Sequence, residues 1–140
     1  MITYQTEDID FPNISKHETT NWIKNVAQQY NKKIGGIAYI FCSDTCILKI
    51  NNEYLQHDYY TDIITFDYST ENIISGDIFI SLDTVKSNAE KYNQPFETEL
   101  HRVIIHGILH LCGQKDKTKK DSEEMRDKEN KALEILNLKF

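Results

Sequence analysis

The sequence predicts an α+β protein with a single small mixed β-sheet of about four strands and about five packed helices. Three observations support this class. The chain of 140 residues is 39% apolar and 27% charged, which is typical of a folded protein. Strand-like and helix-like segments follow one another along the chain, and no repeat, low-complexity tract or linker separates them. We therefore expect residues 1–140 to form a single domain.

The first third of the chain predicts a strand, a helix and a second strand. Residues 1–6 suit a strand, and Ser15 with Glu18 fits a capping box at the start of a helix whose apolar residues recur every four positions. The glycine pair at 35–36 is expected to end that helix. Residues 37–42 are apolar throughout, which predicts a buried strand.

The middle of the chain predicts a second helix and a β-hairpin. Ser43 or Asp44 is suited to cap the helix. Residues 62–68 and 73–81 are rich in β-branched and aromatic side chains and are separated by a short polar turn. We expect these two segments to pair as a hairpin.

Three helices are predicted after the hairpin. The first begins at Asp83 and continues to about residue 92. The second has Pro95 in its first turn and runs through Leu111 to a stop at Gly113. The last is amphipathic, and its apolar stripe consists of Met125, Ala132, Leu133 and Leu136.

Charge and composition limit the possible partners. Sixteen Lys and Arg residues stand against 22 Asp and Glu residues, a net charge of −6, so any nucleic-acid contact must be local.

No apolar stretch is long enough to span a bilayer, and the start MITYQTEDIDF does not resemble a signal peptide. We expect a cytoplasmic protein without membrane contact. Three cysteines, an odd number, favour reduced thiols.

Two histidines on the helix that ends at Gly113 suggest a metal site. His106 and His110 stand four residues apart, so both imidazoles reach one ion from the same helix face. The pair alone is weak evidence, because this spacing also occurs by chance. Gly107 is expected to leave room above the helix, and Gly113 lets the chain return so that Asp116 supplies a third ligand. Three ligands leave a fourth position for an exchangeable water, the expected catalytic group.

Residues 106–116, HGILHLCGQKD, resemble the HGxLHLxGxxH signature of the YbeY family of rRNA maturation endoribonucleases. Two further segments are similar to the same family in the same order. They are INNEYLQHDYYTDIITFDY (50–68) and SGDIFISLDTV (75–85). The resemblance covers about residues 47–136, and the combination of three segments is highly specific.

The resemblance implies an α+β metalloenzyme that binds one Zn²⁺ per chain through His106, His110 and Asp116. The implied activity is single-strand-specific endoribonuclease cleavage in 16S rRNA 3′ end maturation and ribosome quality control. The implied partners are single-stranded rRNA and the ribosome or its proteins. Two positions depart from the family pattern, because Asp116 replaces the usual histidine and Leu55 replaces an arginine. Aspartate keeps the capacity to bind metal, whereas Leu55 removes a cation near the RNA.

Several polar residues near the motif have more than one interpretation. Lys115, Lys117 and Lys119 are candidate RNA contacts, although such a run is also typical of a solvated loop. Asp77 is either a structural hydrogen-bond acceptor or a partner that orients a ligand histidine. His57 lies in a polar segment, where it is either a solvated loop histidine, the interpretation we favour, or a residue at the edge of the cleft.

Two other functions compete with RNA cleavage. Zinc metallopeptidases also use histidines four residues apart, but they carry a glutamate directly after the first histidine, where this chain has Gly107. A non-catalytic ribosome assembly factor stabilised by a metal is the stronger alternative, because the chain is acidic and has Leu55 in place of the arginine.

Overall fold

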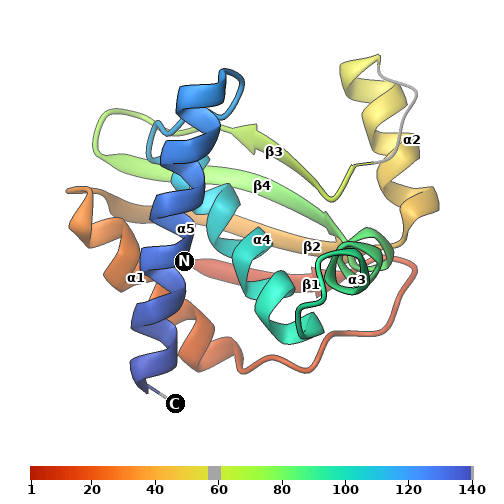
Figure 1. Cartoon of the computed structure of the whole chain (residues 1–140). Helices are drawn as coiled ribbons and strands as arrows, with labels where there is room; N and C mark the ends of the chain where they lie inside the picture. The colour runs from red at the N-terminus through yellow and green to blue at the C-terminus, as the bar shows by residue number, and fades with distance from the viewer. Residues whose placement is uncertain (57–60, 140) are drawn as a thin grey trace.

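The computed structural model describes residues 1–56 and 61–139, and the described part contains five helices and one four-stranded sheet, as predicted (Figure 1). The strands are β1 (Ile2–Thr6), β2 (Lys33–Cys42), β3 (Ile63–Asp67) and β4 (Ile73–Ser81). The helices are α1 (Lys16–Gln29), α2 (Asp44–Leu55), α3 (Leu82–Lys91), α4 (Phe96–Leu111) and α5 (Lys119–Lys139). Among these helices, none combines the length and apolar character needed to cross a bilayer.

The sheet mixes parallel and antiparallel pairs in the order β1-β2-β4-β3. Strands β1, β2 and β4 are parallel, and β3 pairs antiparallel with β4. The predicted hairpin is therefore confirmed. Parallel neighbours need a crossover connection, which α1 provides between β1 and β2.

The glycine pair at 35–36 does not end the first helix, and this prediction is wrong. Helix α1 ends at Gln29, and Asn31 turns the chain with a φ of 60° before both glycines enter β2. A Cβ on Gly35 would lie 2.3 Å from Oγ of Ser75 on the neighbouring strand β4. The glycine is there because β2 and β4 approach closely, at an irregularity in their register.

The sheet carries a large core on one face and a small one on the other. Helices α1, α3, α4 and α5 cover the first face, where Tyr39 and Phe41 of β2 and Ile78 of β4 are fully buried (Figure 1). Helix α2 lies against the opposite face, where Ile47 packs with Ile64 of β3. Alternate strand residues thus serve opposite faces, as the pleat requires.

Helix α4 is held tightly on the first face. A Cβ on Gly107 would lie 3.1 to 3.2 Å from side-chain atoms of Ile63 and Ile78, so the glycine permits close packing on β3 and β4. The space at Gly107 is therefore filled by the sheet, which corrects the expectation that it opens toward the site. The hydroxyl of Tyr39 donates a 2.8 Å hydrogen bond to the carbonyl of Ile104. The sheet thus fixes the position of α4.

Candidate metal centre

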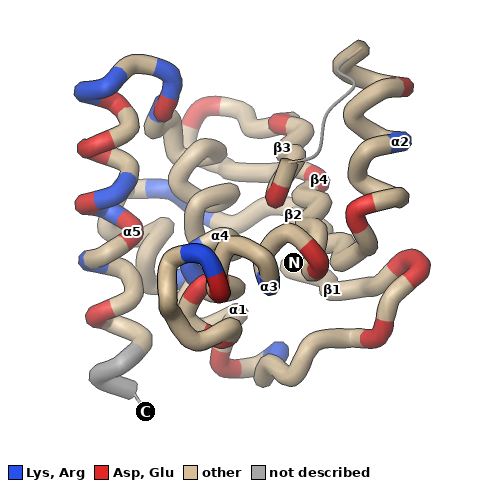
Figure 2. Tube along the Cα trace, turned by 45° about the vertical axis from the view of Figure 1, so that its right-hand side comes forward, with Lys and Arg blue, Asp and Glu red and all other residues tan. Residues whose placement is uncertain are grey.

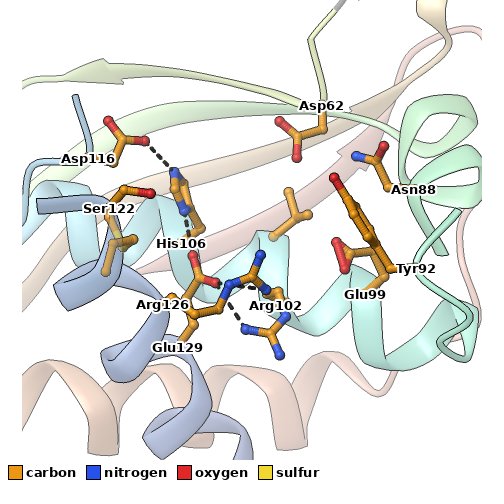
Figure 3. A pocket seen from close by; sticks show the side chains of 12 residues that line it. Asp62, Asn88, Tyr92, Glu99, Arg102, His106, Asp116, Ser122, Arg126 and Glu129 are labelled. Carbon is orange, nitrogen blue, oxygen red and sulfur yellow. Dashed lines mark hydrogen bonds and ion pairs between the residues drawn. The ribbon is translucent and has the colours of Figure 1, made fainter. Parts of the chain in front are cut away.

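His106, His110 and Asp116 converge at the end of α4. The histidines lie one turn apart, and Gly113, with a φ of 102°, reverses the chain after the helix. As a result, Oδ2 of Asp116 lies 3.3 Å from Nε2 of each histidine. Figure 3 shows the Asp116 carboxylate directed at His106. The structure therefore brings together all three residues that the sequence singled out.

The donor set fits a divalent metal. The potential ligand atoms of His106, His110 and Asp116 all lie within 4.8 Å of one another. Two imidazole nitrogens and a carboxylate oxygen are ordinary zinc ligands, and a three-ligand set leaves a position for substrate. Among residues 1–56 and 61–139, no other group of His, Cys, Asp or Glu side chains meets the same test.

Glu129 of α5 orients the ring of His106. Its Oε2 lies 2.6 Å from Nδ1 of His106, and its Oε1 accepts a 3.1 Å hydrogen bond from Arg102. Glu129 is only 5% exposed, so this arrangement is shielded from water. If the carboxylate holds the proton on Nδ1, Nε2 of His106 carries a free lone pair, which can bind a metal, on the side of Asp116.

The pKa of His106 reflects these neighbours. Burial lowers the pKa of this imidazole, but the hydrogen bond and the charge of Glu129 raise it, as do Asp116 and Asp62. The net result is a pKa above the ordinary histidine value. The surroundings of His106 therefore attract positive charge, which favours a bound cation as well as a proton.

Sequence reasoning did not identify Glu129, although a signal was present. Glu129 follows Met125 by four residues and precedes Ala132 by three, so it lies on the buried stripe of α5. Trp22 of α1 fixes this part of α5 by donating a 2.8 Å hydrogen bond to the carbonyl of Ala132. A carboxylate on an apolar helix face requires a partner, and here the partners are His106 and Arg102.

Asp77 does not orient a ligand histidine. Its Oδ2 accepts a 3.3 Å hydrogen bond from the hydroxyl of Tyr68, which links the two strands of the hairpin. Of the two interpretations left open by the sequence, the structural one is favoured.

Two hollows adjoin the three converging residues. The larger one encloses about 570 Å³ and is lined in part by Leu55 and Lys117. The smaller one encloses about 220 Å³ on the side of α5. Asp62, His106 and Asp116 line both, so the candidate metal centre lies between them. Burial raises the pKa of Asp62, although the charge of His106 opposes this.

The candidate RNA-binding lysines differ in position. All three side chains are exposed, and Lys117 also lines the larger hollow. Lys115 lies on the turn before α5, and Lys119 is the first residue of that helix. Figure 2 shows basic residues gathered at this end of α5. Leu55 is 41% exposed and also lines the larger hollow, so the position at which the resemblance implies an arginine lies at the site. His57 lies outside the described residues.

These features define a small α+β protein with a candidate divalent-metal centre, and comparisons identify its family. A family model described as Endoribonuclease YbeY matches residues 1–137. The chain is 64% identical over 138 residues to Endoribonuclease YbeY of Phocaeicola vulgatus, covering 99% of this chain and 100% of that protein. It is 66% identical over 132 residues to Endoribonuclease YbeY of Bacteroides fragilis, covering 94% and 95%. The solution structure of a Thermotoga maritima protein matches with a TM-score of 0.70 and 29% identity, covering 97% and 89%. The chain belongs to the endoribonuclease YbeY family.

Family membership confirms the resemblance and the enzyme class expected from the sequence, a nuclease that hydrolyses phosphodiester bonds in rRNA processing. It counts against a purely non-catalytic assembly factor. The metallopeptidase alternative also fails on geometry, because the side of α4 at Gly107 faces Ile63 and Ile78 of the sheet. A general-base glutamate at this position would be buried against the sheet and away from the substrate.

Proposed function

We propose that residues 1–140 form one metal-dependent, single-strand-specific endoribonuclease domain. Its proposed task is maturation of the 3′ end of 16S rRNA and ribosome quality control in the cytoplasm. Its proposed partners are single-stranded rRNA and the ribosome or its proteins. One observation carries the metal dependence, namely that a single Asp116 oxygen lies 3.3 Å from Nε2 of both His106 and His110.

In this proposal His106, His110 and Asp116 hold one divalent ion, with zinc as the expected metal. A bound ion supplies Lewis acidity at the scissile phosphate. Glu129 holds the proton on Nδ1 of His106 and thereby keeps the ligand nitrogen correctly oriented. The packing of α5 along α4 buries most of Glu129, and the two hollows remain as the approach for RNA.

Lys117 is the proposed backbone contact nearest the scissile phosphate on the side of the larger hollow, because it lines that hollow together with His110. Lys115 and Lys119 are proposed to contact the strand beyond it. Local contacts of this kind suit a chain of net charge −6, which has no overall excess of positive charge to attract RNA.

Cleavage of a fluorescently labelled RNA spanning the precursor 3′ end of 16S rRNA tests this function. We expect metal-loaded protein to cut the single strand and to spare the same sequence in a duplex. His110→Ala should lower the rate by about 100-fold or more, because a ligand is lost. His17→Ala, which removes an exposed histidine on α1, is the matched control and should keep the parent rate. Cleavage by His110→Ala at the parent rate would refute the proposal.

A further inference from the structure

The smaller hollow beside the candidate metal centre is not needed to hold a metal. It lies between α3, α4 and α5 and adjoins His106 and Asp116 (Figure 3). Its volume of about 220 Å³ exceeds what a few waters require and is too small for a nucleic-acid duplex. Polar side chains from all three helices converge on it, which points to a small polar ligand.

The only two arginines of the chain, Arg102 and Arg126, line this hollow. Arg102 is 18% exposed and lies 3.1 Å from Oε1 of Glu129. The other carboxylate oxygen of Glu129 is taken by His106. Arg126 stands 3.9 Å from the oxygen that Arg102 already occupies, and its side chain is 57% exposed. The guanidinium of Arg126 therefore keeps most of its hydrogen-bonding capacity, and phosphate is the ligand that suits it best.

The opposite wall of the hollow offers groups that recognise a nucleobase. Asn88 belongs to α3, Tyr92 follows its last residue, and Asp62 precedes β3. Figure 3 shows the Tyr92 hydroxyl, the Asn88 amide and the Asp62 carboxylate directed toward the same space. Tyr92 is 54% exposed, and Nζ of Lys91 lies 5.3 Å from the centroid of its ring. Amide and carboxylate oxygens accept hydrogen bonds from exocyclic amino groups, and exposed aromatic rings contact unstacked bases.

The charges of the hollow limit what it holds. Four carboxylates stand with the two arginines in its lining, so there is no surplus of positive charge for several phosphates; they belong to Asp62, Glu99, Asp116 and Glu129. One phosphate at Arg126 and one base at the opposite wall satisfy this distribution, whereas a polyphosphate does not.

We propose that this hollow binds one ribonucleotide of the single-stranded substrate, next to the scissile phosphate. Arg126 binds its phosphate, and Asn88, Asp62 and Tyr92 contact its base. Because the acceptors favour an exocyclic amino group, the subsite prefers cytosine over uracil. The inference rests on the proposed function, since it assumes that RNA reaches the metal centre.

The phosphate contact is tested by fluorescence anisotropy with a labelled ten-nucleotide RNA and metal-free protein, which should bind the RNA without cleaving it. Gels confirm that the RNA stays intact. Arg126→Gln should weaken binding and lower the slope of log affinity against log salt by about 0.7, the value for one phosphate of a single strand. Arg126→Lys should restore part of the affinity. The control is Lys131→Gln, which removes one charge from an exposed position of the same helix outside the hollow. Equal salt slopes for Arg126→Gln and Lys131→Gln would overturn the proposal.

The base contact is tested by comparing oligocytidine with oligouridine of the same length. The parent should bind oligocytidine about five- to tenfold more tightly, and Asn88→Ala should reduce that ratio without changing the salt slope. Equal affinity of the parent for both oligomers would overturn the base preference. A parent that cleaves RNA but shows none of these effects refutes the subsite alone. A parent that neither binds nor cleaves single-stranded RNA refutes the proposed function.

Discussion

His106 and His110 lie four residues apart on one helix, yet their surroundings differ. The side chain of His106 is 19% exposed and touches two carboxylates, Asp116 through Nε2 and Glu129 through Nδ1. The side chain of His110 is 30% exposed, and within the described residues its carboxylate partner is Asp116. The ring of His106 is thus held in one orientation by its two partners, whereas His110 has fewer contacts that would fix its ring.

This difference indicates that His106 and His110, although both are histidines, need not contribute equally to metal affinity. A side chain that is already fixed loses little conformational entropy on binding, while a freer one loses more. We therefore regard His106, Glu129 and Arg102 as the preformed half of the site. His110 and Asp116, on the open edge of α4 and the turn after it, form the adjustable half.

The largest expected effect comes from removing one histidine at a time. His106→Ala and His110→Ala should each weaken zinc affinity by more than about 100-fold, and His106→Ala should be the weaker binder because it deletes the oriented ligand. Competition with a chromogenic zinc chelator measures both values. His101→Ala, on the same helix but turned away from the site, serves as the control. Equal affinities in the two ligand variants would contradict the asymmetry.

Removing the orienting carboxylate sharpens the comparison further. Glu129→Gln should lower zinc affinity by about 10- to 100-fold, the usual cost of losing a partner that orients a metal-bound histidine. Glu123→Gln, which neutralises an exposed carboxylate of the same helix, is the control and should leave the affinity unchanged. Thermal unfolding of the metal-free variants shows whether the fold is retained. Parent-like affinity in folded Glu129→Gln would mean that Glu129 does not position His106.

The adjustable half of the site should control metal preference. Two imidazoles and one carboxylate accept iron and manganese as well as zinc, whereas three imidazoles favour zinc more strongly. Asp116→His should therefore keep metal binding and raise the ratio of zinc to manganese affinity by about tenfold. Isothermal titration with each metal gives the ratio. An unchanged ratio would indicate that Asp116 is not a ligand.

The smallest effect concerns Glu99, a buried carboxylate on α4. Burial raises its pKa, although Arg102 and Arg126 oppose this. The folded state therefore binds the proton more tightly than the unfolded state, so Glu99 favours folding below its ordinary pKa and loses this contribution as pH rises through the raised value. Glu99→Gln should be more stable than the parent at neutral pH, by on the order of 1 kcal/mol.

Urea unfolding at several pH values checks this prediction. The difference in the free energy of unfolding between Glu99→Gln and the parent should shrink as the pH falls toward about 3. At that pH Glu99 of the parent is protonated and therefore uncharged, like the glutamine. Glu90→Gln, which neutralises an exposed carboxylate on α3, is the control for removing a carboxylate that is not buried. A constant difference across the pH range would show that the carboxyl group is not the cause.

Local signals predicted much of the fold and the three converging residues. The turn between β3 and β4, the cap Ser15 and the stop at Gly113 act within a few residues, so they are visible in the sequence. The continuation of β2 through Gly35 was not predictable, because it depends on the close approach of Ser75 from another strand.

The partners of the converging residues were less visible for the same reason. Glu129 lies 23 residues after His106 and reaches it only because α5 packs along α4. Arg102 and Arg126 come together around Glu129 through the same packing. A carboxylate on the buried stripe of α5 indicated that some partner exists, but the identity of that partner depends on the tertiary arrangement.

The most direct test of the central claim is a titration of metal-free protein with zinc while RNA cleavage and bound zinc are followed together. We expect no cleavage without metal, then a linear rise in rate that ends at one zinc ion per chain. In His110→Ala neither RNA cleavage nor bound zinc should rise over the same range of zinc concentration. Full cleavage by the metal-free protein, or a rate that rises after the first equivalent has bound, would contradict a single metal centre at His106, His110 and Asp116.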